Sequence, residues 1–195
     1  MTLGRPLQFD PEQALESAMQ LFWRKGYEAT SLQDLLQATG LSKSSLYQTF
    51  GNKHTLFEQC VEHYRRNMIQ KMQEMLAQAS SGRAFIKQLF LGVFDETQGE
   101  NAHRGCLIMN TASEFAQSDP VIAKLVTQGT KAFAELFQAA ITQAIAEGDI
   151  PPKKDVKVLA SYLMASLTGL KTLVKSGTSA EEVKAITGVI LSTLE

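Results

Sequence analysis

The sequence feature that most constrains the fold is the run from residue 30 to residue 57, TSLQDLLQATGLSKSSLYQTFGNKHTLF. Thr30 stands three residues before Gln33, which is the spacing of a capping box at the start of a helix. Three leucines follow at the spacing of one helical face, and Gly40 supplies the backbone freedom that ends a helix. We therefore predict a short helix over about 31–38.

A second short helix is predicted directly after that glycine. Ser42 is placed to cap it, and Leu46 and Phe50, four residues apart, form its inward side. Two short helices joined by a tight turn are the helix-turn-helix pattern, in which the second helix enters the major groove of DNA. The side chains left on the outward side of this helix are Lys43, Ser44, Tyr47 and Gln48.

The charges around this second helix favour contact with a phosphate backbone. Between Asp34 and Glu58 the charged residues are two lysines and no acid, so the surface carries no negative charge. Asn52 can cap a further long helix, whose first N–H groups face the same side. The alternative is the solvated surface of an ordinary helical bundle. Our candidate DNA-binding residues are Thr30, Ser31, Ser42, Lys43, Ser44, Tyr47, Gln48, Thr49, Asn52 and Lys53.

These residues resemble the DNA-binding domain of TetR-family transcriptional regulators, through the run T-S-L-x-D-L-x-x-A-T-G-L-S-K-x-S-L-Y-x-x-F-x-x-K-x-x-L-F. Residues 21–31, LFWRKGYEATS, resemble the end of the family's first helix and the turn after it. Two positions depart from the pattern, since Ser44 stands where many members have Gly, and Thr49 where many have His or Tyr. The resemblance covers about the first third of the chain and implies a protein that binds double-stranded operator DNA.

Length and composition leave room for one further domain. The 195 residues, 44% of them hydrophobic, suffice for a small DNA-binding module and a larger helical domain. Apolar spacings of three and four continue along the chain without the alternation typical of strands, so we predict an all-α fold of about nine helices. The expected parts are a helix-turn-helix domain over 1–57, a long linking helix over about 52–79, and a helical effector-binding and dimerisation domain over 58–195.

No broad basic field supports DNA binding. The net formal charge is −1, and residues 1–57 hold five basic and five acidic side chains. Specific binding should therefore depend on base contacts, helix N-termini and the avidity of a dimer. Arg5, in a short arm before the first helix, is a further candidate for DNA contact, with a solvated terminus as the alternative.

Phenylalanines are concentrated in the expected second domain, where six of the ten fall between residues 85 and 137. At helical spacing they can form a plain core or line a ligand cavity, and the family resemblance favours the cavity. The implied ligand is a small-molecule effector, apolar or electrophilic. The candidate cavity residues are Phe90, Phe94, Cys106, Met109, Phe115, Phe133 and Phe137.

A homodimer is predicted from the last two helices, expected over about 153–175 and 179–194. They combine large apolar residues with small ones, a mixture that suits close helix packing. Two DNA half-sites about one helical turn apart also require a two-fold partner. The candidate interface residues are Leu163, Leu167, Leu170, Val183, Ile186 and Ile190.

The two cysteines make a disulfide framework improbable. Cys60 falls in the apolar stripe of the linking helix, and we favour a buried structural role over a metal site shared with His63. Cys106 stands at an expected helix start, where exposed N–H groups favour a thiolate. The run Gly105–Leu107 also resembles the corresponding position in TetR-family members that sense reactive compounds through a cysteine, and a buried structural cysteine remains the alternative.

Several classes of protein are not supported by the sequence. No run of about 20 apolar residues and no charged-then-apolar leader occurs, so we expect a cytoplasmic protein without a membrane span or secretory signal. We find no convergent nucleophile and base, no zinc spacing and no phosphate loop, so no enzyme activity, cofactor or metal is expected.

These observations predict a ligand-responsive transcriptional regulator. We expect a repressor that binds a pseudo-palindromic operator as a dimer and leaves it when a small-molecule effector binds. The alternative is a helical ligand-binding or scaffold protein without DNA affinity, which would show no sequence-specific shift in a gel-shift assay.

Overall fold

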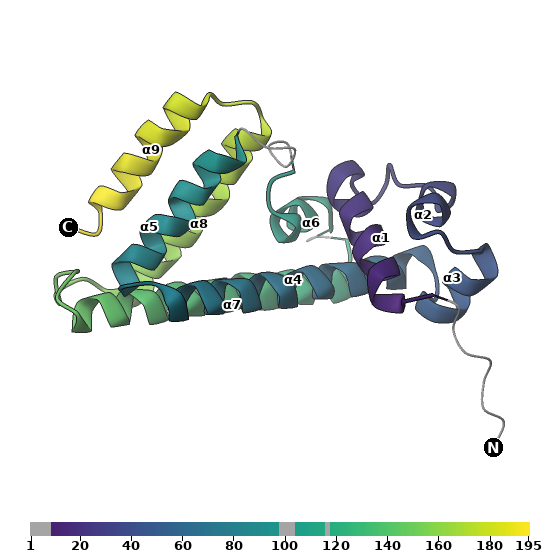
Figure 1. Ribbon diagram of the computed structural model, residues 1–195, viewed down its shortest axis with the longest axis horizontal. Coiled ribbons are helices and arrows are strands. Elements are labelled where there is room, and N and C mark those ends of the chain that lie inside the picture. The colour runs from purple at the N-terminus through teal and green to yellow at the C-terminus, as the bar shows by residue number, and fades with distance from the viewer. Residues whose placement is uncertain (1–8, 98–103, 116–117) are drawn as a thin grey trace, which may run out of the picture. The chain divides into compact units, whose positions relative to one another are not determined.

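In the part of the chain that the structure describes, the regular elements are α-helices (Figure 1). The computed structural model describes residues 9–97, 104–115 and 118–195, so Arg5 lies outside the described residues. Within these ranges there are nine helices and no strand, which confirms the predicted all-α class. The helices are α1 (Pro11–Lys25), α2 (Leu32–Thr39), α3 (Lys43–Phe50), α4 (Lys53–Gln78), α5 (Gly82–Glu96), α6 (Leu107–Phe115), α7 (Pro120–Ala146), α8 (Val156–Lys175) and α9 (Ala180–Ser192).

The chain divides into two compact units, Met1–Tyr64 and Arg65–Glu195, and the division falls within α4. The first unit contains α1, α2, α3 and the beginning of α4. The second contains the remainder of α4 together with α5 to α9. Among the described residues, no helix is long and apolar enough to cross a membrane.

Side-chain caps set the helix starts of the first unit. Asp10 accepts a hydrogen bond from the backbone N–H of Glu12 at 2.9 Å, and Pro11, which has no N–H to satisfy, follows it at the first position of α1. The capping box of α2 differs from the prediction, because it pairs Ser31 with Asp34 rather than Thr30 with Gln33. As a result, α2 begins at Leu32.

Thr30 has a different role, which explains the shift of the capping box. Its hydroxyl donates to the carbonyl of Gly26 at 2.6 Å, and the residue is fully buried. The carboxylate of Asp34 meanwhile accepts from the backbone N–H of Ser31 at 2.9 Å and lies 2.9 Å from the Lys25 amino group. A carboxylate accepts these bonds better than the amide of Gln33, so the cap forms around Ser31.

An aromatic cluster forms part of the core of the first unit. The ring centres of Phe22 and Phe57 are 5.0 Å apart, as are those of Tyr27 and Phe57. Cys60 is fully buried on α4, with its sulfur 3.8 Å from the carbonyl of Leu15. This burial confirms the predicted structural role over an exposed one, and it raises the pKa of the Cys60 thiol well above its usual value.

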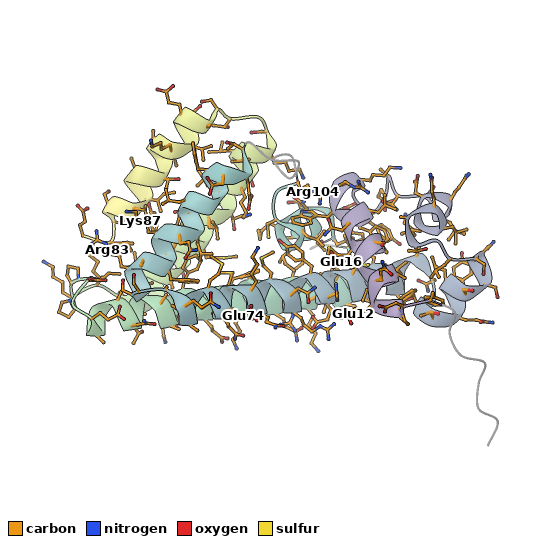
Figure 2. All side chains as sticks on the ribbon, viewed as in Figure 1. Glu12, Glu16, Glu74, Arg83, Lys87 and Arg104 are labelled. Atoms are coloured by element: carbon orange, nitrogen blue, oxygen red, sulfur yellow. The ribbon has the colours of Figure 1, made fainter. Side chains whose placement is uncertain are left out.

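His63 pairs with a carboxylate of α1. Its Nε2 atom lies 2.9 Å from Oε2 of Glu16, which is labelled on α1 in Figure 2. Among the described residues, no group of three or more histidines, cysteines and acidic residues could hold a metal ion.

In the second unit, α7 packs against α5, α6 and α8, and α9 packs against α5 and α8 (Figure 1). The start of α5 is especially close to α7, because a Cβ atom at Gly82 would lie 2.0 Å from the carbonyl oxygen of Ala140. The backbone N–H of Gly82 donates to Oε2 of Glu147 at 2.9 Å. Arg83, labelled at the start of α5 in Figure 2, donates to the carbonyl of Asp149 at 3.3 Å. Gly82 therefore permits close packing within the second unit.

The last two helices begin at capping residues. Asp155 caps α8, which starts at Val156, three residues later than the predicted 153. Ser179 caps α9 by accepting from the backbone N–H of Glu182 at 3.2 Å.

Candidate nucleic-acid interface

The second short helix of the helix-turn-helix pattern is α3. Ser42 caps it by accepting from the backbone N–H of Ser45 at 3.1 Å, as predicted from the sequence. Leu46 and Phe50 are buried, and this anchors one side of α3 in the core. Gly51 ends the helix with φ of 81°, a left-handed conformation that favours glycine.

The opposite side of α3 is open to solvent. Lys43, Ser44 and Gln48 are exposed, and Tyr47 is 40% exposed. The Lys43 amino group lies 5.9 Å from the ring centre of Tyr47, within the range of a weak cation–π contact. Polar and cationic groups with no carboxylate thus share one face, which is the composition that a DNA groove accepts.

The start of α4 adds a second set of groups beside α3. Asn52 is exposed, and its Oδ1 accepts from the backbone N–H groups of His54 at 2.9 Å and Thr55 at 3.0 Å, so Asn52 caps α4. The amino group of Lys53 lies 4.2 Å from the ring centre of Tyr27. The start of α4 therefore combines a helix N-terminus with a lysine, both of which favour an anion.

The remaining candidates for DNA contact differ in exposure. Thr49 is half-buried, and Ser31 is exposed with its hydroxyl donating to Asp34 at 2.8 Å. The hydrogen bond from Lys25, and then those from Ser31, hold the pKa of Asp34 well below its usual range, so this carboxylate is charged and paired. Thr30 is fully buried and its hydroxyl is engaged within the turn, which leaves its side chain no access to DNA.

Two side chains near α3 were missed by the sequence reasoning. The hydroxyl of Thr55 lies 2.7 Å from the carbonyl oxygen of Phe50, and the side-chain amide of Gln59 donates to the same oxygen at 3.2 Å. Thr55 could have been found from its spacing, because it stands three residues after Asn52 and donates and accepts like the second member of a capping box. No local pattern marks Gln59, which is nine residues from Phe50.

The candidate effector residues come from α5, from α6 with the turn before it, and from α7. Phe90 and Phe137 are fully buried, with ring centres 6.4 Å apart. Phe115 and Phe133 are also buried, whereas Phe94, Cys106 and Met109 are half-buried.

The candidate dimer residues lie mostly inside the protomer. Leu163, Leu170, Val183 and Ile190 are buried, and Leu167 and Ile186 are half-buried. The regular apolar stripe of α8 and α9 therefore marks the side that packs within the second unit. The large apolar side chains exposed on these two helices are Val158, Tyr162, Leu173 and Val189.

Comparison with known families gives two matches that together span most of the chain. The family described as bacterial regulatory proteins, tetR family, matches residues 14–60. The family described as tetracyclin repressor-like, C-terminal domain, matches residues 82–187. The boundary between the two matches falls along α4 and the start of α5.

Individual relatives extend this similarity over nearly the whole chain. The HTH-type transcriptional repressor ComR of Escherichia coli is 31% identical over 96% of this chain and 90% of its own length. The uncharacterized HTH-type transcriptional regulator YezE of Bacillus subtilis is 29% identical over 99% of this chain and 100% of its own. A cysteine mutant of the TetR family regulator CifR, solved in complex with 26-base-pair operator DNA, superposes with a TM-score of 0.83 at 27% identity, covering 98% of this chain and 100% of that one.

Proposed function

This chain belongs to the TetR family of bacterial regulatory proteins, and on that premise we propose that it represses transcription as a dimer on a pseudo-palindromic operator and leaves the DNA when a small molecule binds its second unit. As a member of that family, the protein is a DNA-binding transcriptional regulator and not an enzyme. Because the protein acts on chromosomal DNA, we expect it to be located in the cytoplasm.

The observation that carries this proposal is the exposed side of α3 next to the start of α4. Lys43, Ser44, Tyr47 and Gln48 are solvent-exposed on a helix whose other side is anchored by buried residues. We assign these four side chains to the bases of the major groove. Contacts to phosphate are assigned to five neighbouring residues, namely Ser31, Ser42, Thr49, Asn52 and Lys53.

A dimer is supported by the outward sides of α8 and α9. Val158 is 66% exposed and Val189 is 68% exposed, and both belong to helices that expose further apolar side chains. Apolar side chains exposed at these positions are available for contact with a second copy of the chain, which would remove them from water. We therefore assign the interface to these outward sides, with Leu167 and Ile186 as half-buried neighbours.

An effector site is supported by the aromatic residues that α5, α6 and α7 carry. Phe90, Phe115, Phe133 and Phe137 provide apolar surroundings, and Phe94 and Met109 are partly accessible. Aromatic and apolar side chains of this kind suit contact with an apolar ligand. Cys106, half-buried before α6, would allow an electrophilic ligand to react with the protein covalently.

A gel-shift assay on the DNA that flanks the protein's own gene tests the proposal, with a scrambled duplex of equal length as control. We expect a sequence-specific shift at physiological salt and a footprint of two half-sites about one helical turn apart. Equal affinity for the two duplexes would contradict the proposal and favour a helical ligand-binding or scaffold protein.

A further inference from the structure

The backbone carbonyl of Phe50, at the C-terminal end of the recognition helix α3, accepts hydrogen bonds from two side chains of α4. We propose that Thr55 and Gln59 of α4 are positioning residues that set the orientation of α3, and so the fit of its outward side chains to the operator. This inference rests on the proposed function, because it concerns how α3 reads DNA. Neither residue is assigned a contact with DNA.

Thr55 occupies the centre of the turn between α3 and α4. Its hydroxyl oxygen lies 2.7 Å from the carbonyl oxygen of Phe50 and 3.0 Å from that of Asn52. A hydroxyl has one proton, and the shorter distance assigns the donated bond to Phe50. The same oxygen accepts from the backbone N–H of Asn52 at 2.9 Å. Thr55 thus connects the last residue of α3 to the capping residue of α4.

Gly51 leaves the space that this hydroxyl needs. A Cβ atom at Gly51 would lie 2.5 Å from Oγ1 of Thr55, closer than side-chain atoms approach one another. Glycine at position 51 therefore leaves room in the turn for the Thr55 hydroxyl.

Gln59 provides the second hydrogen bond to the same carbonyl. Its Nε2 atom donates to the Phe50 oxygen at 3.2 Å. Thr55 and Gln59 are four residues apart, so they lie on one face of α4. A carbonyl oxygen has two lone pairs and can accept both bonds at once.

These two hydrogen bonds restrict the tilt of α3, which the packing of its buried residues alone does not. Leu46 and Phe50 are buried and determine which side of α3 faces inward. Apolar contacts are non-directional, however, whereas hydrogen bonds weaken steeply when their angle changes. Because α3 has eight residues, a small tilt at its C-terminal end moves Tyr47 and Gln48 relative to the bases. The two bonds to Phe50 therefore fix the tilt of the recognition helix.

The test compares affinity for the operator, taken as the duplex from the gene-flanking DNA, with affinity for the scrambled duplex at one salt concentration. Thr55→Val removes the hydroxyl with little change of shape, and Gln59→Met removes the donor at similar length. Thr55→Ser keeps the hydroxyl. Gln70→Met is the matched control, because Gln70 also lies on α4 but pairs with Glu74.

We expect Thr55→Val and Gln59→Met each to weaken operator binding by about threefold to tenfold, the worth of one hydrogen bond. Binding to the scrambled duplex should change much less, because the assigned phosphate contacts of Ser31, Asn52 and Lys53 come from outside α3 and carry no sequence information. The double variant should lose more than either single variant. Thr55→Ser and Gln70→Met should match the wild type. Gln59 is exposed, so its variant is expected to fold even where a change at Thr55 destabilises the domain.

Two results would overturn the inference. One is an unchanged ratio of operator to scrambled affinity in the double variant. The other is an equal loss on both duplexes that tracks a lower melting temperature and is not rescued by serine at position 55, because that pattern belongs to a stability role. If the wild-type protein itself binds both duplexes equally, the proposed function is overturned. That failure is distinguishable from failure of this inference, because it occurs without any substitution.

Discussion

The amino group of Lys53 lies 4.2 Å from the ring centre of Tyr27, so a cation at the start of α4 rests against an aromatic face from the turn after α1. The Tyr27 ring is itself held by Phe57, at 5.0 Å between ring centres, and by His54, at 6.1 Å. This arrangement restricts a long, flexible side chain before DNA arrives, which lowers the entropy lost on binding.

The first prediction concerns this contact. Tyr27→Leu should weaken binding to every DNA sequence by about twofold to fivefold, since exposed cation–π contacts are worth about 0.5–1 kcal/mol. Tyr27→Phe keeps the ring and should bind as the wild type does. In a Lys53→Ala background, Tyr27→Leu should cost nothing further, as measured by a double-mutant cycle of dissociation constants. An undiminished loss in that background would mean that Tyr27 acts through the core alone.

The second prediction separates reading of bases from contact with phosphate. Lys53→Ala should weaken operator and scrambled DNA alike and reduce the slope of log affinity against log salt by about 0.9. Gln48→Ala should instead relax the base preference at one position of each half-site, by about 1–3 kcal/mol. Titrations at several salt concentrations measure both effects. If Lys43→Ala, Tyr47→Ala and Gln48→Ala all left operator affinity unchanged, α3 would not be the reading helix.

The third prediction follows from the lowered pKa of Asp34, caused first by the Lys25 hydrogen bond and then by those from Ser31. A carboxyl whose pKa is lower in the folded state stabilises the fold above its unfolded pKa of about 3.9, and this stabilisation is lost as the pH falls through the folded pKa. Asp34→Asn should therefore lower the melting temperature at pH 7, with a difference from the wild type that shrinks below about pH 4.

Thermal unfolding followed by circular dichroism at several pH values checks this prediction. Glu135→Gln is the control, because the Glu135 carboxylate is exposed and lies 3.9 Å from Lys131, a pair that should contribute little. A difference between Asp34→Asn and the wild type that is the same at pH 3 and pH 7 would show that the charge of Asp34 does not contribute.

The fourth prediction concerns the dimer. Tyr162→Glu combined with Val189→Glu should place like charges in the interface and yield a monomer in sedimentation, with operator affinity reduced by more than about 10²-fold through lost avidity. Val121→Glu is the control, because Val121 is an exposed apolar residue on α7. An unchanged dimer would show that the interface does not involve these sides of α8 and α9. Ile190→Glu would be a poor test, because Ile190 is buried and its change would disturb the fold.

Local chemistry made much of the fold predictable. Asp10 with Pro11, Ser42 and Ser179 cap helices as their positions indicate, because a cap depends on residues within one turn. The exposed side of α3 was predictable for the same reason, since Leu46 and Phe50 fix the inward direction.

Contacts between distant residues were not predictable in this way. The leucines of α8 gave the correct apolar periodicity, but a stripe does not say whether its partner is the same chain or a second copy, and Leu163 and Leu170 prove to be internal. The close approach of Gly82 to Ala140 and the bond from Gln59 to Phe50 likewise depend on how helices pack, which no short pattern encodes. Thr30 was misassigned because Asp34 competes better than Gln33 for the capping position.

The fifth prediction concerns Cys106, which stands in a turn held in place by polar contacts. The side-chain amide of Asn110 donates to the carbonyl of Arg104 at 2.8 Å, and the Lys175 amino group donates to Oδ1 of Asn110 at 3.0 Å. The turn therefore connects the start of α6 to the end of α8. A group attached to the Cys106 sulfur would displace this turn and so shift the start of α6 and the end of α8.

N-ethylmaleimide provides the test. Added to the protein–operator complex, it should release the DNA, and Cys106→Ser should abolish the release while leaving operator affinity intact. Cys60 is the internal control, because its buried thiol with a raised pKa should be labelled only after unfolding. Mass spectrometry of the labelled peptides follows the two sites. If the Cys106→Ser variant were still released, or if Cys106 were labelled no faster than Cys60, covalent sensing at this residue would be excluded and the signal would have to enter by non-covalent binding among the phenylalanines of α5, α6 and α7.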